Sequence, residues 1–181
     1  MGTYVVLFRS VNVGGRNRVA MPDLRDVVAS LGFGDVVTYV QSGNVVCTGR
    51  GKPSSVAETI ARGVEENLGL AVPVLVRSGR RWAGVLGGNP LASLDDDPKK
   101  LHVTFLDRVA DPERVARLAG EVERFAPDRL QVVGADVFLH CPGGYGQTAL
   151  TNAFLERKLG VTATTRNWRT VLALADLAGL P

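Results

Sequence analysis

Arginine side chains beside glycine-rich turns are the groups in this sequence best suited to recognising an anion. Arg9 ends an otherwise apolar run, and a charge at the end of a buried strand needs a partner or a ligand. Glycines in the segment 12–18 let a phosphate or carboxylate approach the backbone closely. We therefore predict that such a ligand is bound by Arg9, Asn12, Gly14, Gly15, Arg16 and Asn17.

Three further segments carry polar groups that could serve the same ligand. Gly144 and Tyr145 lie in the glycine-rich stretch 142–148, and we expect both glycine-rich segments to enter helices, whose first N–H groups attract anions. Arg166 and Asn167 follow a short run of β-branched residues, and a guanidinium can hold a carboxylate or phosphate through two hydrogen bonds. The tip of an expected hairpin adds Gln41, Ser42 and Asn44.

Each of these groups also has a purely structural explanation. The glycines could simply turn the chain, and the polar residues at 41–44 are the types that tight turns favour. Asn167 is a natural N-cap for a final helix, Trp168 a natural packing anchor, and Arg166 could pair with a neighbouring carboxylate. Both explanations stay open at the level of sequence.

Catalytic and metal-binding patterns are sparse. His102 and His140 both fall within strand-like runs, and no grouping of Cys, His, Asp and Glu has the spacing of a metal site. Cys47 and Cys141 each follow an apolar run, which favours buried, reduced thiols. The phosphate-binding loop pattern G-x-x-x-x-G-K-[ST] and the third glycine of a dinucleotide fingerprint are absent. We predict neither a metal nor a cofactor.

Composition limits the class of protein. The chain has 181 residues, 45% of them hydrophobic and 22% charged, as in ordinary globular proteins. It contains no run of about 18 apolar residues and no leader pattern, so we expect a cytoplasmic protein without a membrane partner. The net charge of +3 permits an anionic small molecule or a nucleic acid as partner. The oligomeric state is left open.

The first half of the chain predicts the order β-α-β-β-α-β. An apolar run over 4–8 suits a buried strand, and apolar residues recur with helical spacing between Pro22 and Gly32. Two β-rich runs, 36–40 and 45–47, flank the turn residues of a hairpin. Ser55 and Glu58 have the spacing of a capping box ahead of a second helix, and a fourth strand follows over 72–76.

The second half repeats this order. A strand over 101–106, a helix capped by Asp111, a hairpin over 130–141 and a final helix from Trp168 follow one another. The fold class is therefore α/β of the α+β kind: two ferredoxin-like β-α-β-β-α-β halves related by internal duplication, plus a C-terminal helix. We place the halves at 1–90 and 99–181, with a linker at 91–98 whose three aspartates face water.

Several blocks resemble signature segments of the bacterial domain-of-unknown-function family 1697, and they span nearly the whole chain. They are Arg9, Asn12–Gly15, Asn17, Gln41–Asn44, Leu101–Leu106 and Thr164–Trp168. The resemblance implies a fold and a set of candidate positions, but no activity. Ser10 stands where the pattern usually has Gly, Ala149 where it usually has Lys, and Arg169 where Asn is common, so no lysine-based anion site is implied near Ala149.

The function that we predict is a binding module for a phosphate-bearing or carboxylate ligand in the cleft between the two halves. A nucleotide or nucleic acid is a possible ligand, although Phe138 is the sole aromatic residue on its strand and recognition of RNA on the sheet face needs several. Binding of RNA through loops stays open, and it would use Arg16, Arg18, Arg50 and Lys52. A small enzyme using the same cleft and a protein-interaction domain are the alternatives. An enzyme would need an acid or base of shifted pKa at the site.

Overall fold

The computed structural model describes all 181 residues. The chain divides into two compact units, unit 1 comprising 1–84 and 173–181 and unit 2 comprising 85–172. The sequence-based ranges placed 173–181 with the second half and 91–98 in a linker. A short 3-10 helix, η1 (Ala92–Leu94), occupies part of that predicted linker. No helix is long and apolar enough to cross a bilayer.

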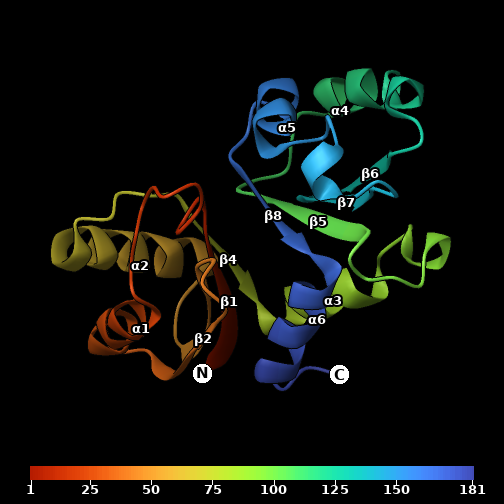
Figure 1. Cartoon of the computed structure of the whole chain (residues 1–181). Coiled ribbons are helices and arrows are strands. Elements are labelled where there is room, and N and C mark those ends of the chain that lie inside the picture. Colours follow the sequence, from red (N-terminus) through yellow and green to blue (C-terminus); the bar gives the residue numbers. More distant parts are fainter. The chain divides into compact units, whose positions relative to one another are not determined.

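Unit 1 is a four-stranded antiparallel sheet with two helices on one face (Figure 1). The strand order is β2-β3-β1-β4, which is that of a ferredoxin-like fold. Helix α3 (Gly79–Gly87) follows the last strand. In chain order the other elements are β1 (Gly2–Phe8), α1 (Met21–Ser30), β2 (Gly34–Tyr39), β3 (Asn44–Gly49), α2 (Pro53–Leu68) and β4 (Val74–Ser78).

The core of unit 1 follows from the alternation of side chains along β1. Tyr4, Val6 and Phe8 lie on the face covered by α1 and α2, and they pack with Leu24 of α1 and Ile60 of α2. The intervening residues of β1 are buried as well. A strand that is buried on both faces reads as a continuous apolar run, which is why the run over 4–8 marks this strand.

Unit 2 has the same topology, with the strand order β6-β7-β5-β8. Two short 3-10 helices, η2 (Val122–Phe125) and η3 (Tyr145–Gln147), interrupt its connections. The last helix is α6 (Trp168–Leu177), whose first five residues belong to unit 2 and whose remaining residues belong to unit 1. The other elements are β5 (Leu101–Leu106), α4 (Pro112–Ala119), β6 (Arg129–Val133), β7 (Asp136–His140), α5 (Asn152–Leu159) and β8 (Ala163–Asn167). The predicted fold class is therefore confirmed.

Strand registers define equivalent positions in the two units. Tyr4 lies opposite Ser78, and His102 opposite Asn167. Main-chain hydrogen bonds repeat as well: Phe8 N donates to Gly43 O at 2.8 Å, and Leu106 N donates to Ala135 O at 2.9 Å. The shared order and register are what a duplication predicts.

Two pairs of like residues, Cys47 with Cys141 and Trp82 with Trp168, do not occupy equivalent positions in the two units. Cys47 lies opposite Tyr4 within β3, but the residue opposite the equivalent His102 is Leu139, and Cys141 follows the end of β7. Trp168 is the first residue of α6, whereas Trp82 is the fourth of α3, almost one turn further along its helix. Equivalent positions in the two units are therefore defined by the strand registers and not by residue type.

The two cysteines are buried and free, as predicted. Burial raises the pKa of each thiol to about 11, so both are protonated at neutral pH. Cys47 packs in the core of unit 1 and Cys141 in that of unit 2.

Helix starts were predicted with mixed success. The Asp111 carboxylate accepts hydrogen bonds from the backbone N–H groups of Glu113 and Arg114, as an N-cap should. The predicted capping box at Ser55 is wrong, because α2 begins two residues earlier, at Pro53, and Lys52 before it makes no side-chain cap. Proline at a first helical position needs no N–H partner, which explains the earlier start.

The aspartates predicted to face water do so only in part. Asp96 and Asp97 are exposed. Asp95 lies 3.3 Å from both His140 Nε2 and Lys100 Nζ. The Asp97 N–H and these two neighbours lower the pKa of the Asp95 carboxyl, against a smaller opposing effect of burial. Asp95 thus links the segment before β5 to His140 at the end of β7.

Candidate functional site

The segment between β1 and α1, residues 9–20, forms a small hairpin of its own. Val13 and Arg16 pair as an isolated antiparallel bridge, with Arg16 N donating to Val13 O at 3.1 Å. Gly14 and Gly15 form the tip with φ of 59° and 76°, the positive values that both central positions of a type I′ turn require. We call residues 9–20 the β1–α1 loop.

Asn12 fixes the base of this loop. Its Nδ2 donates to Val19 O and to Gln41 O, each at 2.9 Å, and its Oδ1 accepts from Val19 N at 2.9 Å. The Asn17 Nδ2 donates to Ser10 O at 3.0 Å. These asparagines therefore act as structural ties of the loop, and their side chains are occupied by the backbone.

Backbone strain is concentrated at this corner of unit 1. The chain has five non-glycine residues with positive φ, and four of them are Ser10, Asn12, Asn17 and Val40. Val40, at φ 48°, is β-branched, so the left-handed conformation is especially unfavourable there. Such strain persists only where the surroundings enforce it, and it is enriched at functional sites.

Two hollows border the β1–α1 loop, and arginines line both. The first, of about 530 Å³, is lined by Arg9, Ser10, Val13, Gly14, Arg16 and Asn17. The second, of about 420 Å³, is lined by Asn12, Gly15, Arg18, Val19 and Ala20. Arg16 and Arg18 are exposed, and neither side chain makes a hydrogen bond or an ion pair. The loop thus presents two unpaired guanidinium groups.

The remaining predicted residues of the loop have distinct placements. Arg9 is half-buried, its backbone N–H donates to Pro73 O, and its Nη1 donates to Ser10 Oγ at 3.2 Å. Gly14 and Gly15 lie six or more residues ahead of α1 and do not form its N-terminus. The prediction that this glycine segment enters a helix is wrong, because the glycines are used by the I′ turn.

The hairpin tip between β2 and β3 lies against this loop, but its predicted ligand groups are largely occupied. Asn44 is fully buried, and its Nδ2 donates to Tyr39 O at 3.1 Å and to Ser42 Oγ at 2.9 Å. Gln41 is exposed, and its carbonyl receives the Asn12 amide. The structure thus gives Ser42 and Asn44 a role in shaping the turn, and of the three only Gln41 keeps an exposed side chain.

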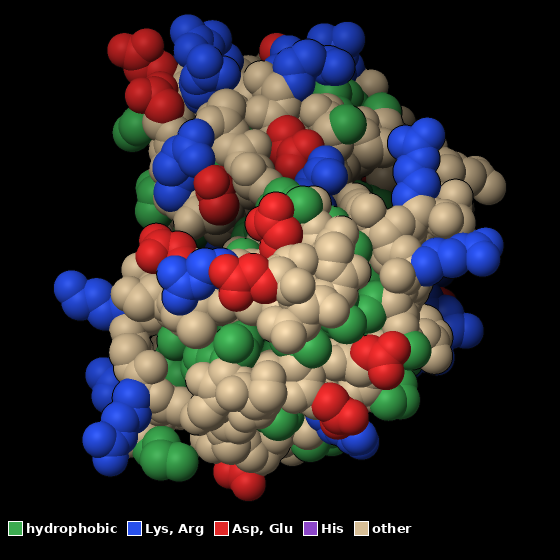
Figure 2. Space-filling model, turned by 90° about the vertical axis from the view of Figure 1, so that its left-hand side faces the viewer, with side chains coloured by type: hydrophobic (Ala, Val, Ile, Leu, Met, Phe, Trp, Pro, Cys, Tyr) green, Lys and Arg blue, Asp and Glu red, His purple; other side chains and the backbone are tan.

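The net positive charge of the chain is carried by unit 1. Its residues include ten Lys and Arg against seven Asp and Glu, whereas unit 2 has eleven of each. On the face drawn in Figure 2, basic side chains alternate with acidic ones and neither sign forms a continuous patch. The sign of the charge therefore varies from place to place on this face.

In unit 2, Gly144 and Tyr145 lie at the short helix η3, and α5 begins only at Asn152 with Thr151 as its cap. The second glycine segment also fails to enter an α-helix, since φ of 89° at Gly144 serves a turn. Tyr145 Oη donates to Thr165 Oγ1 at 3.1 Å, and its ring stacks on His102 with centroids 4.8 Å apart. Tyr145 is thus part of a polar network.

Thr165 is the centre of that network. Its Oγ1 accepts from Tyr145, donates to Asn152 Oδ1 at 2.7 Å and lies 2.7 Å from Thr104 Oγ1. Burial raises the pKa of Tyr145, so its hydroxyl stays protonated and can donate. A hydroxyl group can donate one hydrogen bond and accept two, so the hydrogen-bonding capacity of Thr165 Oγ1 is fully used.

His102 and Asn167 extend the network along β5 and β8. Asn167 Nδ2 lies 3.3 Å from His102 Nε2 and donates to Lys99 O at 3.1 Å, while its Oδ1 accepts from Arg169 N at the start of α6. The predicted N-cap is therefore confirmed. Burial lowers the pKa of His102, with a smaller opposing effect of the Lys100 main chain, which favours the neutral ring.

Arg166 is buried, with only 8% of its surface exposed. Its Nη1 donates to Thr164 Oγ1 at 2.8 Å and to Thr165 O at 2.9 Å, and burial lowers its pKa to about 10. Within unit 2, these neighbours already occupy part of its hydrogen-bonding capacity.

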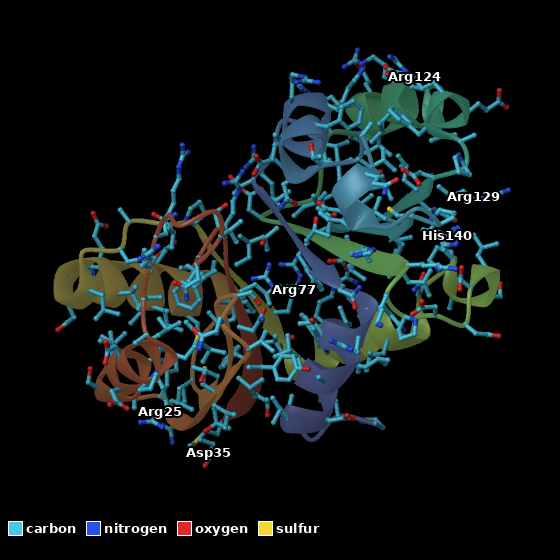
Figure 3. The ribbon with its side chains drawn as sticks, in the orientation of Figure 1. Arg25, Asp35, Arg77, Arg124, Arg129 and His140 are labelled. Carbon is cyan, nitrogen blue, oxygen red and sulfur yellow. The ribbon has the colours of Figure 1, made fainter.

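Sequence reasoning missed Arg77, which is the equivalent of Arg166 in unit 1. Arg77 lies opposite Val5 and Arg166 opposite Val103, and Arg77 is also only 8% exposed (Figure 3). The signal available was a charge directly after the apolar run of β4.

The fold and the arrangement of its polar groups define a protein of two ferredoxin-like units. Residues 1–138 match the family described as protein of unknown function (DUF1697), and the chain belongs to that family. The conserved bacterial protein SP0830 from Streptococcus pneumoniae is similar in structure, with a TM-score of 0.76, 21% identity and 98% of each chain covered. At this identity the likeness shows the fold. No curated protein matches the chain.

Proposed function

We propose that unit 1 binds a phosphate-bearing or carboxylate ligand at the β1–α1 loop. The observation that carries the proposal is a contrast within this loop. The side chains of Asn12 and Asn17 are held by the backbone, whereas the guanidinium groups of Arg16 and Arg18 have no protein partner. Guanidinium groups fit the two oxygens of a carboxylate or phosphate, and a charge-assisted hydrogen bond is about twice as strong as a neutral one.

The form of the loop supports the same ligand class. The Gly14 and Gly15 tip carries no side chain that would keep a ligand from the backbone, and nothing lies within 4 Å of the position of a Cβ at Gly14. Hollows on the surface beside the tip offer room for a phosphate group. The prediction that Arg166 shares this ligand stays a prediction.

Binding is favoured over catalysis at this loop. An enzyme needs an acid or base whose pKa is matched to its task. The buried groups with a shifted pKa, among them Cys47, His102 and Tyr145, line neither hollow.

Titration of the isotopically labelled protein with inorganic phosphate tests the proposal. We expect the largest changes in amide chemical shift at Gly14, Gly15 and Arg16, because these groups border the hollows. The variant Arg16→Ala/Arg18→Ala should lose the response, whereas Arg62→Ala, which removes one exposed charge from α2, should keep it. Phosphate that perturbs no amide of the loop, or perturbs it equally in the double variant, would refute the proposal.

A further inference from the structure

The two arginines of the β1–α1 loop serve different hollows although they are only two residues apart. Arg16 lines the hollow of about 530 Å³ and Arg18 the hollow of about 420 Å³. Asn17 between them has a φ of 50°, so the chain turns there instead of continuing as an extended strand. Arg18 accordingly runs back beside the tip, where its Nη2 would lie 3.7 Å from a Cβ on Gly15.

The turn at Asn17 is held by more than one contact. Its side chain donates to Ser10 O at 3.0 Å and its carbonyl accepts from Asn12 N at 3.1 Å. Because Asn17 is tied at both its side chain and its main chain, the separation of Arg16 from Arg18 is built into the loop.

We infer that the β1–α1 loop grips a linear chain of phosphate groups through both hollows at once. This chemistry is shared by nucleic-acid strands and inorganic polyphosphate, and the inference rests on the proposed function of the same loop. A single phosphate reaches one hollow, whereas a ligand with successive phosphates reaches Arg16 and Arg18 together. The second contact is then intramolecular and occurs at a high effective concentration.

The surroundings of the loop fit an extended ligand better than an enclosed one. The residues of the loop tip, Val13–Asn17, line the two hollows and are all exposed, so a strand can pass over the tip without displacing protein. None of the residues lining either hollow is aromatic, so the loop offers no surface for stacking a base. Recognition here would depend on the phosphates and be insensitive to sequence.

The excess of basic residues in unit 1 favours such a ligand further. Ten Lys and Arg against seven Asp and Glu give this unit the whole formal charge of the chain. The one opposing group at the start of α1 is Asp23, an exposed carboxylate in the first turn. It disfavours an anion at the helix start itself and leaves the arginines as the contacts.

Fluorescence anisotropy with a labelled single-stranded oligonucleotide of about 12 nucleotides, a length within the site sizes of OB-fold domains that bind single strands, tests the inference. We expect Arg16→Ala and Arg18→Ala each to weaken binding about tenfold, since each removes a charge-assisted contact. Each should also reduce by about one the slope of log K against log salt. Arg62→Ala should change neither quantity beyond its nonspecific charge effect.

Inorganic phosphate and long-chain polyphosphate are the competing probes. If polyphosphate displaces the labelled oligonucleotide at a far lower total phosphate concentration than inorganic phosphate does, the inference is supported. Comparing polyphosphate with unlabelled oligonucleotide as competitors then shows which of the two phosphate chains the loop prefers. If inorganic phosphate, polyphosphate and the oligonucleotide all compete equally well per phosphate group, the inference is overturned, while the proposed function stays intact. An oligonucleotide that binds the double variant as tightly as the parent would overturn it too.

Discussion

The connection from first strand to first helix differs sharply between the two units. In unit 1 it is the twelve-residue loop 9–20, and in unit 2 only the five residues 107–111 separate β5 from α4. Both connections start at the same place, because Arg9 N donates to Pro73 O and Asp107 N donates to Thr162 O. The extra residues of loop 9–20 are therefore an insertion into a strand arrangement that the two units share.

Arginines in the two connections have different roles. In unit 2, Arg108 pairs with Asp107 at 2.7 Å and donates to the carbonyl of Gly160, the C-cap residue of α5. In unit 1, Arg16 and Arg18 serve no protein group. A charge that stabilises nothing in its own fold is the better candidate for ligand binding.

The sheets differ as well, at positions that the registers make equivalent. On the helix-covered face, unit 1 has Val6 opposite Val76, and unit 2 has Thr104 opposite Thr165. Burying polar groups costs free energy unless they are hydrogen-bonded. Unit 2 meets this cost with the network centred on Thr165. The two copies thus keep the same topology with different interiors.

The largest effect should come from Gly43 and its equivalent Ala135. Gly43 has φ of 67°, and a Cβ there would lie 2.8 Å from Phe8 Cβ, so Gly43→Ala should cost roughly 2–4 kcal/mol of unfolding free energy. Ala135→Gly should cost about 1 kcal/mol or less. Denaturant unfolding measures both. If both variants lost the same unfolding free energy, close packing at Gly43 would not distinguish the hairpin of unit 1 from that of unit 2.

A smaller effect concerns the pH dependence of unit 2. The unfolded chain protonates His102 near its ordinary value of 6.5, whereas burial lowers the folded pKa, so unfolded molecules bind more protons between the two values. Unfolding free energy should therefore fall as the pH drops from 7 through this window. His102→Gln, which has no titrating ring, should show a flatter profile in denaturant unfolding at pH 7 and pH 5. An unchanged slope in that variant would contradict the neutral, buried ring.

The smallest effects should separate the arginines of the two connections. Arg108→Ala should cost about 0.5–1 kcal/mol, because it removes hydrogen bonds to Gly160 O and Asp107 from a largely exposed side chain. Arg16→Ala should change the unfolding free energy by no more than about 0.5 kcal/mol. Thermal and denaturant unfolding provide the test. A clear loss in Arg16→Ala would reveal a structural role and weaken its assignment to ligand binding.

The fold was predictable because its signals are periodic. Continuous apolar runs marked the buried strands, and the helical recurrence of Leu24 and Val28 marked α1. The Asp111 cap could be read because Asp before Pro at a helix start has few other roles.

The candidate site was predictable in position but not in form. Residues 9–20 stood out through their glycines and arginines. No local rule predicts a left-handed Val40 or Ser10, because tertiary contacts impose these conformations. The Asn12 amide is occupied by Gln41 O from a distant segment, and the Asn44 amide by Tyr39 O and Ser42 Oγ within its own turn. Judged from residue type alone, Asn12 and Asn44 looked more available to a ligand than they are, and Arg18 looked less available.

The left-handed residues of the β1–α1 loop have an entropic consequence for binding. A flexible loop must give up conformational freedom when it closes on a ligand, and that loss weakens affinity. Here Ser10, Asn12 and Asn17 already hold unfavourable φ angles, and the asparagine ties secure them during folding. The loop is thus preorganised, and little of the energy of ligand contacts would be spent on ordering it.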